Sequence, residues 1–268
     1  MKTVYLSSFC TAFQDYERLR AFADACENAG VELATSWTYP EFDALLDVQQ
    51  ERFKDVPVTL HAPFVEISGA PDSEERRIMT QAFEKAFRWY DLFGATSMVM
   101  HTHEKRVAPG EKEEMIRFSR MAVCDVAATA KVKGIHLTVE NVGYPNKGNA
   151  LFTKNEFVDF IGSLPDEVGA LIDTGHAMAN HWDIPELVKT LGTRIRGYHL
   201  HNTDGVHDLH RPIFEQGLWY DKQEMWKLLE TIAEYSPDAD LVLEYAPGEH
   251  ITAELLREDV RCVQSVWR

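Results

Sequence analysis

The sequence predicts an α/β fold, a (β/α)8 TIM barrel that occupies residues 1–268 as a single domain. Three observations predict it. Eight short apolar stretches alternate with eight helical patterns, which is the order of a parallel βα barrel. No linker or low-complexity segment interrupts them, and 268 residues is a usual length for one such barrel. A doubly wound open sheet is the alternative, but no GxGxxG motif follows the first predicted strand.

Helix-to-strand junctions repeat along the chain. The N-terminal stretch MKTVYLSSFC fits a first strand better than a signal peptide, because its apolar run is short and carries one Lys. The stretches CENAGVELATS, DLFGATSMVMHTH and KVKGIHLTVENV pass from a charged helix end through Gly30, Gly94 and Gly134 into an apolar strand. Because Gly takes the left-handed conformation at low steric cost, each of these glycines predicts a junction. The predicted strands are 2–7, 31–35, 57–61, 97–101, 135–140, 169–173, 195–201 and 240–244.

Helix starts agree with this order. The segment 74–93 follows Asp72 and Ser73, and its first turn is acidic, as the helix dipole favours. Its apolar residues recur at helical spacing. Pro185, after Asp183, is an ordinary first-turn proline. The predicted helices are 14–28, 41–53, 74–93, 112–132, 154–162, 184–191, 222–235 and 252–266.

Charge and cysteine content limit the function classes. The chain has 27 Lys and Arg against 43 Asp and Glu, a formal net charge of −16. Nucleic-acid binding depends on neutralising phosphates, so this balance argues against DNA or RNA as a partner. Cys10, Cys26, Cys124 and Cys262 form no CxxC pair, which indicates reduced thiols in a cytoplasmic protein. No apolar run approaches the roughly 20 residues needed to cross a membrane.

The stretch YHLHNTDGVHDLH at 198–210 carries the densest group of ligand-type residues. His199 and His201 end an apolar strand, and Asp208 and His210 follow within a short polar loop. Because strand side chains alternate faces, both histidines of the strand point to the same side of the sheet. Imidazole and carboxylate are the usual ligands of zinc, manganese and iron, so the stretch predicts a metal site. The alternative is a solvated or pH-sensitive surface loop.

Similar residues stand at the ends of other predicted strands, where the active sites of βα barrels form. Glu140, Asp173 and Glu244 each follow an apolar run, and an unpaired carboxylate there would cost several kcal/mol of desolvation. A cation between them is therefore expected. A lone histidine is more often a hydrogen-bonded barrel-mouth residue than a ligand. The choice between His101 and His103 as a ligand stays open. The full set at the strand ends is His61, His101, His103, Glu140, Asp173, His176, His201 and Glu244.

These motifs resemble the xylose-isomerase-like barrel superfamily, which includes sugar isomerases and epimerases, among them the sugar phosphate branch, and the family-2 abasic-site endonucleases. The resemblance runs from HAPF at 61–64 to LEY at 243–245, and IDTGHA and HLHNTDG with VHDLH are its most specific parts. In the isomerase branch, the positions of Glu140, Asp173, His201 and Glu244 bind one divalent metal and the two glutamates are the acid/base pair. In the endonuclease branch, three metals are held at positions matched here by His61, His101, Glu140, Asp173, His176, His201, Asp208, His210 and Glu244.

Two departures bear on the choice of branch. The residues after Glu140 read Asn141-Val142-Gly143-Tyr144, where the endonucleases carry an Asn-Thr-Ala-type run. Those enzymes also have longer glycine-rich DNA-binding loops. Phe214 stands where many isomerase relatives carry Gly, so the substrate loop differs from the usual one. With the net charge, these differences favour a small-molecule substrate.

The function predicted is a metal-dependent isomerase or epimerase of a small sugar or polyhydroxy carbonyl compound in carbohydrate metabolism, acting by proton transfer through an enediolate. One divalent ion, zinc, manganese, iron or cobalt, would polarise the carbonyl. Glu140 and Glu244 would move the proton, with His176 as a further catalytic group. The predicted substrate contacts are His199, His103, Trp37, Phe64, Arg211 and Trp219, with Tyr39 as a further pocket wall.

Two alternatives stay open. A multinuclear-metal hydrolase or phosphodiesterase would use up to three ions and the additional ligands His61, His101, His176, Asp208 and His210. A non-catalytic sugar-binding barrel would not need so many ionisable groups at its mouth. The partner expected is a sugar-like small molecule, with no nucleic acid and no membrane, and a homo-oligomer stays open.

Overall fold

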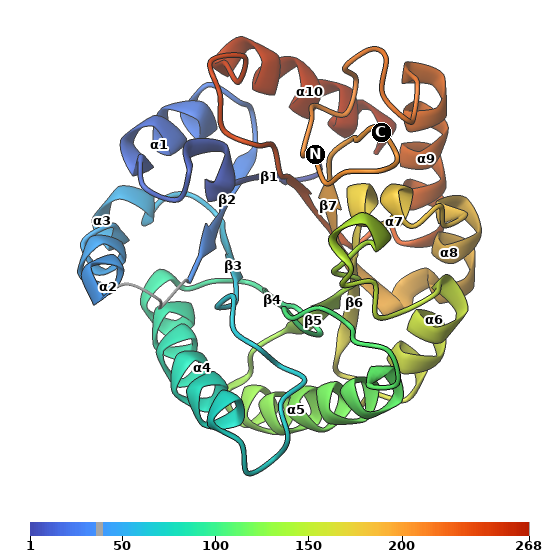
Figure 1. Ribbon diagram of the computed structural model, residues 1–268. Coiled ribbons are helices and arrows are strands. Elements are labelled where there is room, and N and C mark those ends of the chain that lie inside the picture. Colours follow the sequence, from blue (N-terminus) through green and yellow to red (C-terminus); the bar gives the residue numbers. More distant parts are fainter. Residues whose placement is uncertain (36–39, 268) are drawn as a thin grey trace.

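The computed structural model describes residues 1–35 and 40–267. Eight parallel strands pair in sequence order, and the first pairs with the last, so the sheet closes into a barrel (Figure 1). This confirms the predicted fold class. The strands are β1 (Val4–Ser7), β2 (Ala29–Ala34), β3 (Val58–His61), β4 (Met98–Met100), β5 (Leu137–Glu140), β6 (Gly169–Asp173), β7 (Ile195–Leu200) and β8 (Asp240–Leu243).

Helices form a ring around the barrel (Figure 1). No helix in the described ranges is both long and apolar enough to span a bilayer. Three short 3-10 helices, η1 (Ser8–Thr11), η2 (Pro145–Lys147) and η3 (Gly192–Arg194), lie in connections. The α-helices are α1 (Tyr16–Asp24), α2 (Pro40–Asp47), α3 (Gln50–Phe53), α4 (Glu74–Phe93), α5 (Lys112–Lys133), α6 (Lys154–Gly162), α7 (Thr174–Ala179), α8 (Ile184–Leu191), α9 (Lys222–Tyr235) and α10 (Ala253–Val266).

Strand alternation separates an apolar layer from a polar barrel interior. Val31 and Leu33 of β2 belong to the buried core shared with the helices, as do the alternate residues of the other strands. The residue between them, Glu32, is also buried but belongs to the opposite face, inside the barrel. The same parity places the ends of β3 and β5, His61 and Glu140, inside the barrel. The sheet therefore directs one polar side chain after another toward a common centre.

The junction glycines divide into two kinds. Gly94 and Gly134 end α4 and α5 in the left-handed conformation, with φ of 59° and 71°, as predicted. Gly30 was predicted as a junction too, and this is wrong, because it lies inside β2. A Cβ there would stand 2.5 Å from the Tyr5 ring and 2.7 Å from the carbonyl of Pro57. Close approach of neighbouring strands, and not a helix end, therefore requires glycine at this position.

Two helical segments also differ from the prediction. The single helix predicted over 41–53 is two helices, α2 and α3, with Gln49 at the start of the second. The helix α7 directly follows β6 and was not predicted. Asp173 begins it, since its carboxylate accepts a hydrogen bond from the backbone of His176 at 2.6 Å. The same side chain thus ends a strand, caps a helix and enters the site described below.

Candidate metal centre and active site

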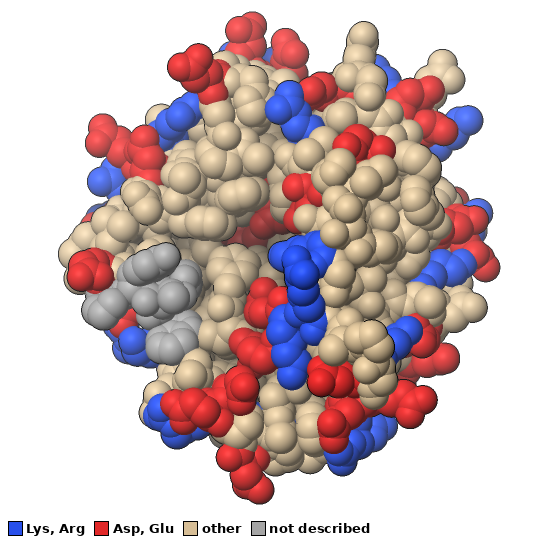
Figure 2. All heavy atoms as spheres, in the orientation of Figure 1, with Lys and Arg blue, Asp and Glu red and all other residues tan. Residues whose placement is uncertain are grey.

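A cavity of about 250 Å³ opens at the carboxyl ends of the strands. Figure 2 shows a hollow at the middle of this face, with Lys and Arg side chains beside it and acidic side chains around the rim. A larger cavity of about 540 Å³ lies at the opposite end of the barrel, where Thr96, His136 and Asp240 stand before or at the strand starts. The cavity at the carboxyl ends holds the ligand-type residues. Its lining is Phe9, Phe13, His61, Phe64, His101, Glu104, Glu140, Val142, Lys147, His176, Asp208, His210 and Glu244.

On one side of the cavity, two histidines face Glu140. The Nε2 atoms of His61 and His101 lie 3.6 and 3.4 Å from Glu140 Oε2. His61 Nδ1 lies 2.8 Å from the carbonyl of Ala62, and His101 Nδ1 lies 2.5 Å from Glu104 Oε1. Because those oxygens accept hydrogen from Nδ1, each ring can present the Nε2 lone pair to the cavity. This is the arrangement by which neighbouring acceptors orient metal-binding histidines.

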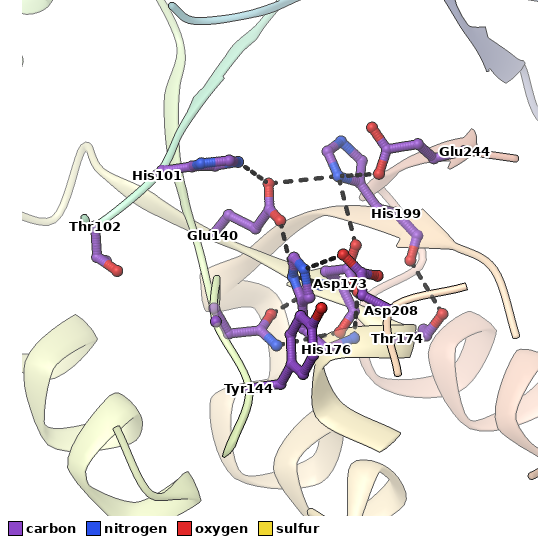
Figure 3. A network of polar contacts seen from close by, with 12 residues as sticks. His101, Thr102, Glu140, Tyr144, Asp173, Thr174, His176, His199, Asp208 and Glu244 are labelled. Carbon is purple, nitrogen blue, oxygen red and sulfur yellow. Dashed lines mark hydrogen bonds and ion pairs between the residues drawn. The ribbon is translucent and has the colours of Figure 1, made fainter. Parts of the chain in front are cut away.

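On the other side, Asp208 lies between two histidines. His176 Nε2 is 3.2 Å from Asp208 Oδ2, and His210 Nε2 is 3.0 Å from Asp208 Oδ1. His176 Nδ1 is 3.2 Å from Glu140 Oε1, so this group adjoins the first one. Figure 3 shows His176 between Glu140 and Asp208.

The floor of the centre comes from β6, β7 and the end of β8. His201 Nε2 lies 2.9 Å from Asp173 Oδ2, and both residues are fully buried. His199 Nδ1 lies 3.4 Å from Glu140 Oε2 and 3.2 Å from Glu244 Oε2 (Figure 3). Of the four predicted metal ligands, Glu140, Asp173 and Glu244 therefore lie within 3.9 Å of His199 Nδ1, and His201 contacts Asp173.

Two small residues hold this floor in place. The Thr174 hydroxyl lies 3.1 and 2.7 Å from the carbonyls of His199 and His201, and so ties β7 to the start of α7. Gly175 lies against the ring of His201, where a side chain would overlap it. The threonine and glycine of the IDTGHA motif therefore position the neighbouring strand rather than contact a ligand.

The pKa values of the histidines and carboxylates in the centre are shifted mainly by their oppositely charged neighbours. Burial alone would lower the pKa of His101, but Glu104 and Glu140 outweigh it and raise this pKa to about 10. Burial is likewise outweighed at His210, where Asp208 raises the pKa to about 9. Burial would raise the pKa of Glu140, but the imidazoles around it, His101 first, hold it well below its usual range. Without a metal, protonated imidazoles supply the positive charge that the carboxylates require.

The donor set fits a divalent metal. Glu140 Oε2 and the Nδ1 atoms of His176, His199 and His201 are buried and have no aligned hydrogen-bond partner among the described residues. Imidazole nitrogen and carboxylate oxygen together suit zinc, manganese, iron or cobalt. Groups of three residues bring such atoms within 4.8 Å of one another: His61, His101 and Glu140; His61, His199 and Glu244; Glu140, Asp173 and His199; His201, His210 and Glu244; His176, Asp208 and His210.

The predicted substrate contacts fall into different places. His199 lies at the floor of the centre and Phe64 lines the cavity, with its ring 4.5 Å from that of His61. His103 is buried and lies 2.6 Å from the carbonyl of Asn149, so it is His101 that faces the cavity. Trp37 and Tyr39 lie outside the described residues.

Arg211 and Trp219 do not line the cavity. Arg211 pairs with Glu215 at 2.7 Å. Trp219 is 45% exposed and packs against His181, with ring centroids 4.9 Å apart. Neither side chain is brought to the centre in this conformation.

Several residues of the site were not predicted. Glu104 follows the VMHTH motif directly and lies beside His101, so its acidic character three residues after a ligand-type histidine was an available signal. Phe9 and Phe13 lie in the loop after β1 and form an apolar wall. Glu32 lies inside the barrel and contacts His199. Its signal was a single acid within the apolar run VELA.

One of the comparisons with known proteins identifies a family. The family model described as xylose isomerase-like TIM barrel matches residues 11–265. No curated protein matches the chain in sequence.

Three solved structures are similar over almost their full lengths. A D-tagatose 3-epimerase-like protein has 18% identity and a TM-score of 0.78, with 100% of this chain and 98% of that chain covered. The IOLI protein with a bound zinc atom has 20% identity and a TM-score of 0.73, with 99% and 96% covered. D-psicose 3-epimerase from Clostridium cellulolyticum H10, solved with D-tagatose, has 15% identity and a TM-score of 0.72, with 100% and 98% covered. At such identities the likeness shows the fold alone, and the family match shows that the chain belongs to the xylose isomerase-like TIM barrel family.

Proposed function

We propose that this protein is a metal-dependent isomerase or epimerase of a small polyhydroxy carbonyl compound. The observation that carries the proposal is the placement of two buried glutamates, Glu140 and Glu244, around one cavity. Both contact His199 Nδ1, at 3.4 and 3.2 Å, and both line the cavity wall. A reaction that removes a proton and returns it elsewhere needs two such groups facing one substrate.

Glu140, Asp173, His201 and Glu244 would hold the metal. When bound, a divalent ion supplies positive charge that stabilises an oxygen gaining negative charge. This assignment is supported by the approach of Glu140, Asp173 and Glu244 to one ring nitrogen of His199, by the contact of His201 with Asp173, and by the chemistry of the donor atoms.

The chain's own residues supply the proton transfer. One glutamate takes a proton from the carbon beside the carbonyl, which leaves an enediolate. The other gives a proton back to the opposite face of the same carbon, which makes an epimer, or to the former carbonyl carbon, which makes an isomer once the hydroxyl proton has passed from one enediolate oxygen to the other. A positioned base typically contributes about 10²–10⁴-fold. His176 lies 3.2 Å from Glu140 and can donate to a substrate hydroxyl.

The apolar wall fits this chemistry. Phe9, Phe13 and Phe64 form one side of the cavity, and the Phe13 and Phe64 rings are 6.0 Å apart. Such a wall displaces water from the reacting carbon while the opposite polar side binds hydroxyls. Two solved relatives are named as ketose 3-epimerases, of D-psicose and L-ribulose, which supports a ketose as the first substrate to test.

Glu244→Gln tests the acid/base assignment. The metal-loaded variant should lose exchange of a substrate C–H proton with D2O, using D-fructose and D-tagatose as probes and proton NMR as the readout. Glu249→Gln, at an exposed glutamate of the following loop, is the matched control and should exchange as the wild type does. Full exchange in Glu244→Gln would contradict the role given to Glu244.

A second candidate function has an observation of its own. The groups His61, His101, Glu140 and His176, Asp208, His210 flank the centre and could each hold a further ion. A hydrolase that uses two or three metals about 4 Å apart would need them. Metal analysis should give about one ion per chain for the isomerase and two or three for the hydrolase.

Replacement of the flanking residues separates the two candidates. His61→Ala and His210→Ala should each leave a one-metal isomerase partly active and should abolish the activity of a cluster enzyme. Hydrolysis of a phosphodiester by the wild type, lost in both variants, would favour the hydrolase over the isomerase.

A further inference from the structure

A carboxylate lies inside the barrel beneath the centre. Glu32 stands in β2 between Val31 and Leu33, and only 2% of its surface is exposed. An ionised carboxylate at such a depth costs several kcal/mol unless a partner compensates. Its placement there therefore calls for a specific interaction.

That interaction is with His199. Oε1 and Oε2 of Glu32 lie 3.2 and 3.3 Å from His199 Nε2. Within the described ranges, His199 is the only basic side chain within 4.0 Å of this carboxylate. Carboxylate oxygens accept hydrogen bonds, so a hydrogen on His199 Nε2 can donate to Glu32. The contact fixes the orientation of the imidazole ring.

The other edge of the same ring faces the acid/base pair. His199 Nδ1 lies 3.2 Å from Glu244 Oε2 and 3.4 Å from Glu140 Oε2, as Figure 3 shows. His199 itself is fully buried, so its ring is held between Glu32 and the two glutamates without contact with solvent. Glu32 thus reaches both glutamates through a single ring. Hydrogen-bonded neighbours of this kind orient the carboxylates and imidazoles of metal sites.

We propose that Glu32 is a positioning residue, which orients the ring of His199 by a hydrogen bond so that the Nδ1 edge of that ring faces Glu140 and Glu244. This inference rests on the proposed function, because it assigns Glu32 a place in that proton transfer. Loss of such a neighbour typically costs about 10–100-fold in activity or metal affinity.

A purely structural role is the alternative. Glu32 also borders a void of about 10 Å³, together with Thr59, Thr138 and Asp240, which is room for about one water. If Glu32 served only to fill and hydrate this part of the barrel, its replacement would lower stability and leave turnover unchanged. Thr59 is 2% exposed and borders the same void, so it provides a matched control.

The first test compares Glu32→Met, Glu32→Gln and Thr59→Val with the wild type, all loaded with saturating metal. The readout is exchange of a ketose C–H proton with D2O. We expect Glu32→Met to lower kcat by about 10–100-fold with little change in KM, because no acceptor then holds His199. Glu32→Gln should recover most of that loss, because its amide oxygen still accepts. Thr59→Val should keep the wild-type kcat.

Two outcomes would overturn the proposal. In the first, Glu32→Met turns over as fast as the wild type. In the second, Glu32→Gln is as slow as Glu32→Met, which would deny the hydrogen bond its role.

A second measurement does not depend on the sugar reaction. In the zinc-loaded protein, the Nε2–H proton of His199 should give a downfield NMR signal, identified by its loss in His199→Gln. Glu32→Gln should move this signal upfield, because a neutral acceptor makes a weaker hydrogen bond than a carboxylate. An unmoved signal would overturn the positioning role. If the signal moves but the wild-type protein exchanges no ketose proton, the contact between Glu32 and His199 is supported and the proposed reaction is contradicted.

Discussion

Gly175 shows how closely the centre is packed at the level of single residues. A Cβ at this position would overlap Cε1 of His201 and stand 2.5 Å from its Nδ1. His201 cannot move away freely, because its other face stacks on His210 at 3.9 Å between ring centroids.

We therefore expect Gly175→Ala to displace His201 and to weaken metal binding by about 10–100-fold. Zinc titration against a chromophoric chelator measures the affinity. Gly162→Ala is the control, since nothing lies within 4 Å of the Cβ it would add at the end of α6. Equal zinc affinity in both variants would show that His201 is not a ligand.

Protonation of the imidazoles should make metal binding depend on pH. The pKa of His101 is about 10 and that of His210 about 9, so both rings are cationic at pH 7 in the absence of metal. A metal-bound imidazole must be neutral, so occupation of the flanking positions releases protons and becomes weaker as pH falls. Calorimetry of zinc binding at pH 7 in two buffers of different ionisation enthalpy should detect this release. Binding without proton release would place the metal only on the central ligands.

For strands and helices, the prediction and the structure agree wherever the residues within one segment determine its secondary structure. The apolar runs gave all eight strands to within about two residues, and strand parity explains why Glu140 and Asp173 meet inside the barrel. The helix α7 was not predicted because it begins on Asp173, a side chain whose local sequence also fits a turn. Glu32 was not predicted because its partner, His199, is 167 residues away. Contacts between distant strands carry no signal in a local pattern.

The misassigned Gly30 gives a prediction at this scale. Gly30→Ala places a methyl group against the Tyr5 ring and the Pro57 carbonyl, between β1 and β3. Such overpacking typically costs about 1–3 kcal/mol of unfolding free energy. Urea unfolding measures it, with Gly162→Ala again as the control. A glycine at a helix end is needed for its positive φ, and Ala there is destabilising because of backbone strain. Gly30 does not have a positive φ, so any loss of stability in Gly30→Ala comes from the close contacts.

In the whole molecule, buried carboxylates lie beside buried imidazoles. The stability of the metal-free protein therefore decreases both when pH falls and the carboxylates are protonated, and when pH rises and the imidazoles lose their charge. The raised pKa values of His101 and His210 stabilise the fold fully below their ordinary value of 6.5, and this contribution is lost as pH rises through about 9 and about 10. The lowered pKa values of Glu140 and Asp208 stabilise the fold above their ordinary values of 4.5 and 3.8, and this contribution is lost as pH falls.

We expect the urea midpoint of the metal-free protein to be highest between about pH 4.5 and 6.5, above the ordinary pKa of the carboxylates and below that of the imidazoles. Chemical unfolding followed by circular dichroism from pH 4 to 10 checks this. A midpoint that does not fall between pH 6.5 and 10 would contradict the raised imidazole pKa values.

Metal removal gives the last prediction. An ion that binds only the folded chain stabilises it by about 2.7 kcal/mol when its free concentration is 100 times its Kd. Adding zinc to the chelator-treated protein should therefore raise Tm in a concentration-dependent way, and Gly175→Ala should need more zinc for the same rise. A Tm that is independent of zinc would count against a metal at this centre.

The closed ring of strands has a practical consequence for assembly of the centre. Its donors come from β3 through β8 and the loops beyond them, while the strand that seals the ring, β1, is the first one synthesised. The stretch 198–210 supplies His199, His201, Asp208 and His210, but Glu140, Asp173 and Glu244 come from three other strands. Because Glu244 follows β8, the strand that pairs with β1, the full donor set is assembled only when the barrel is closed.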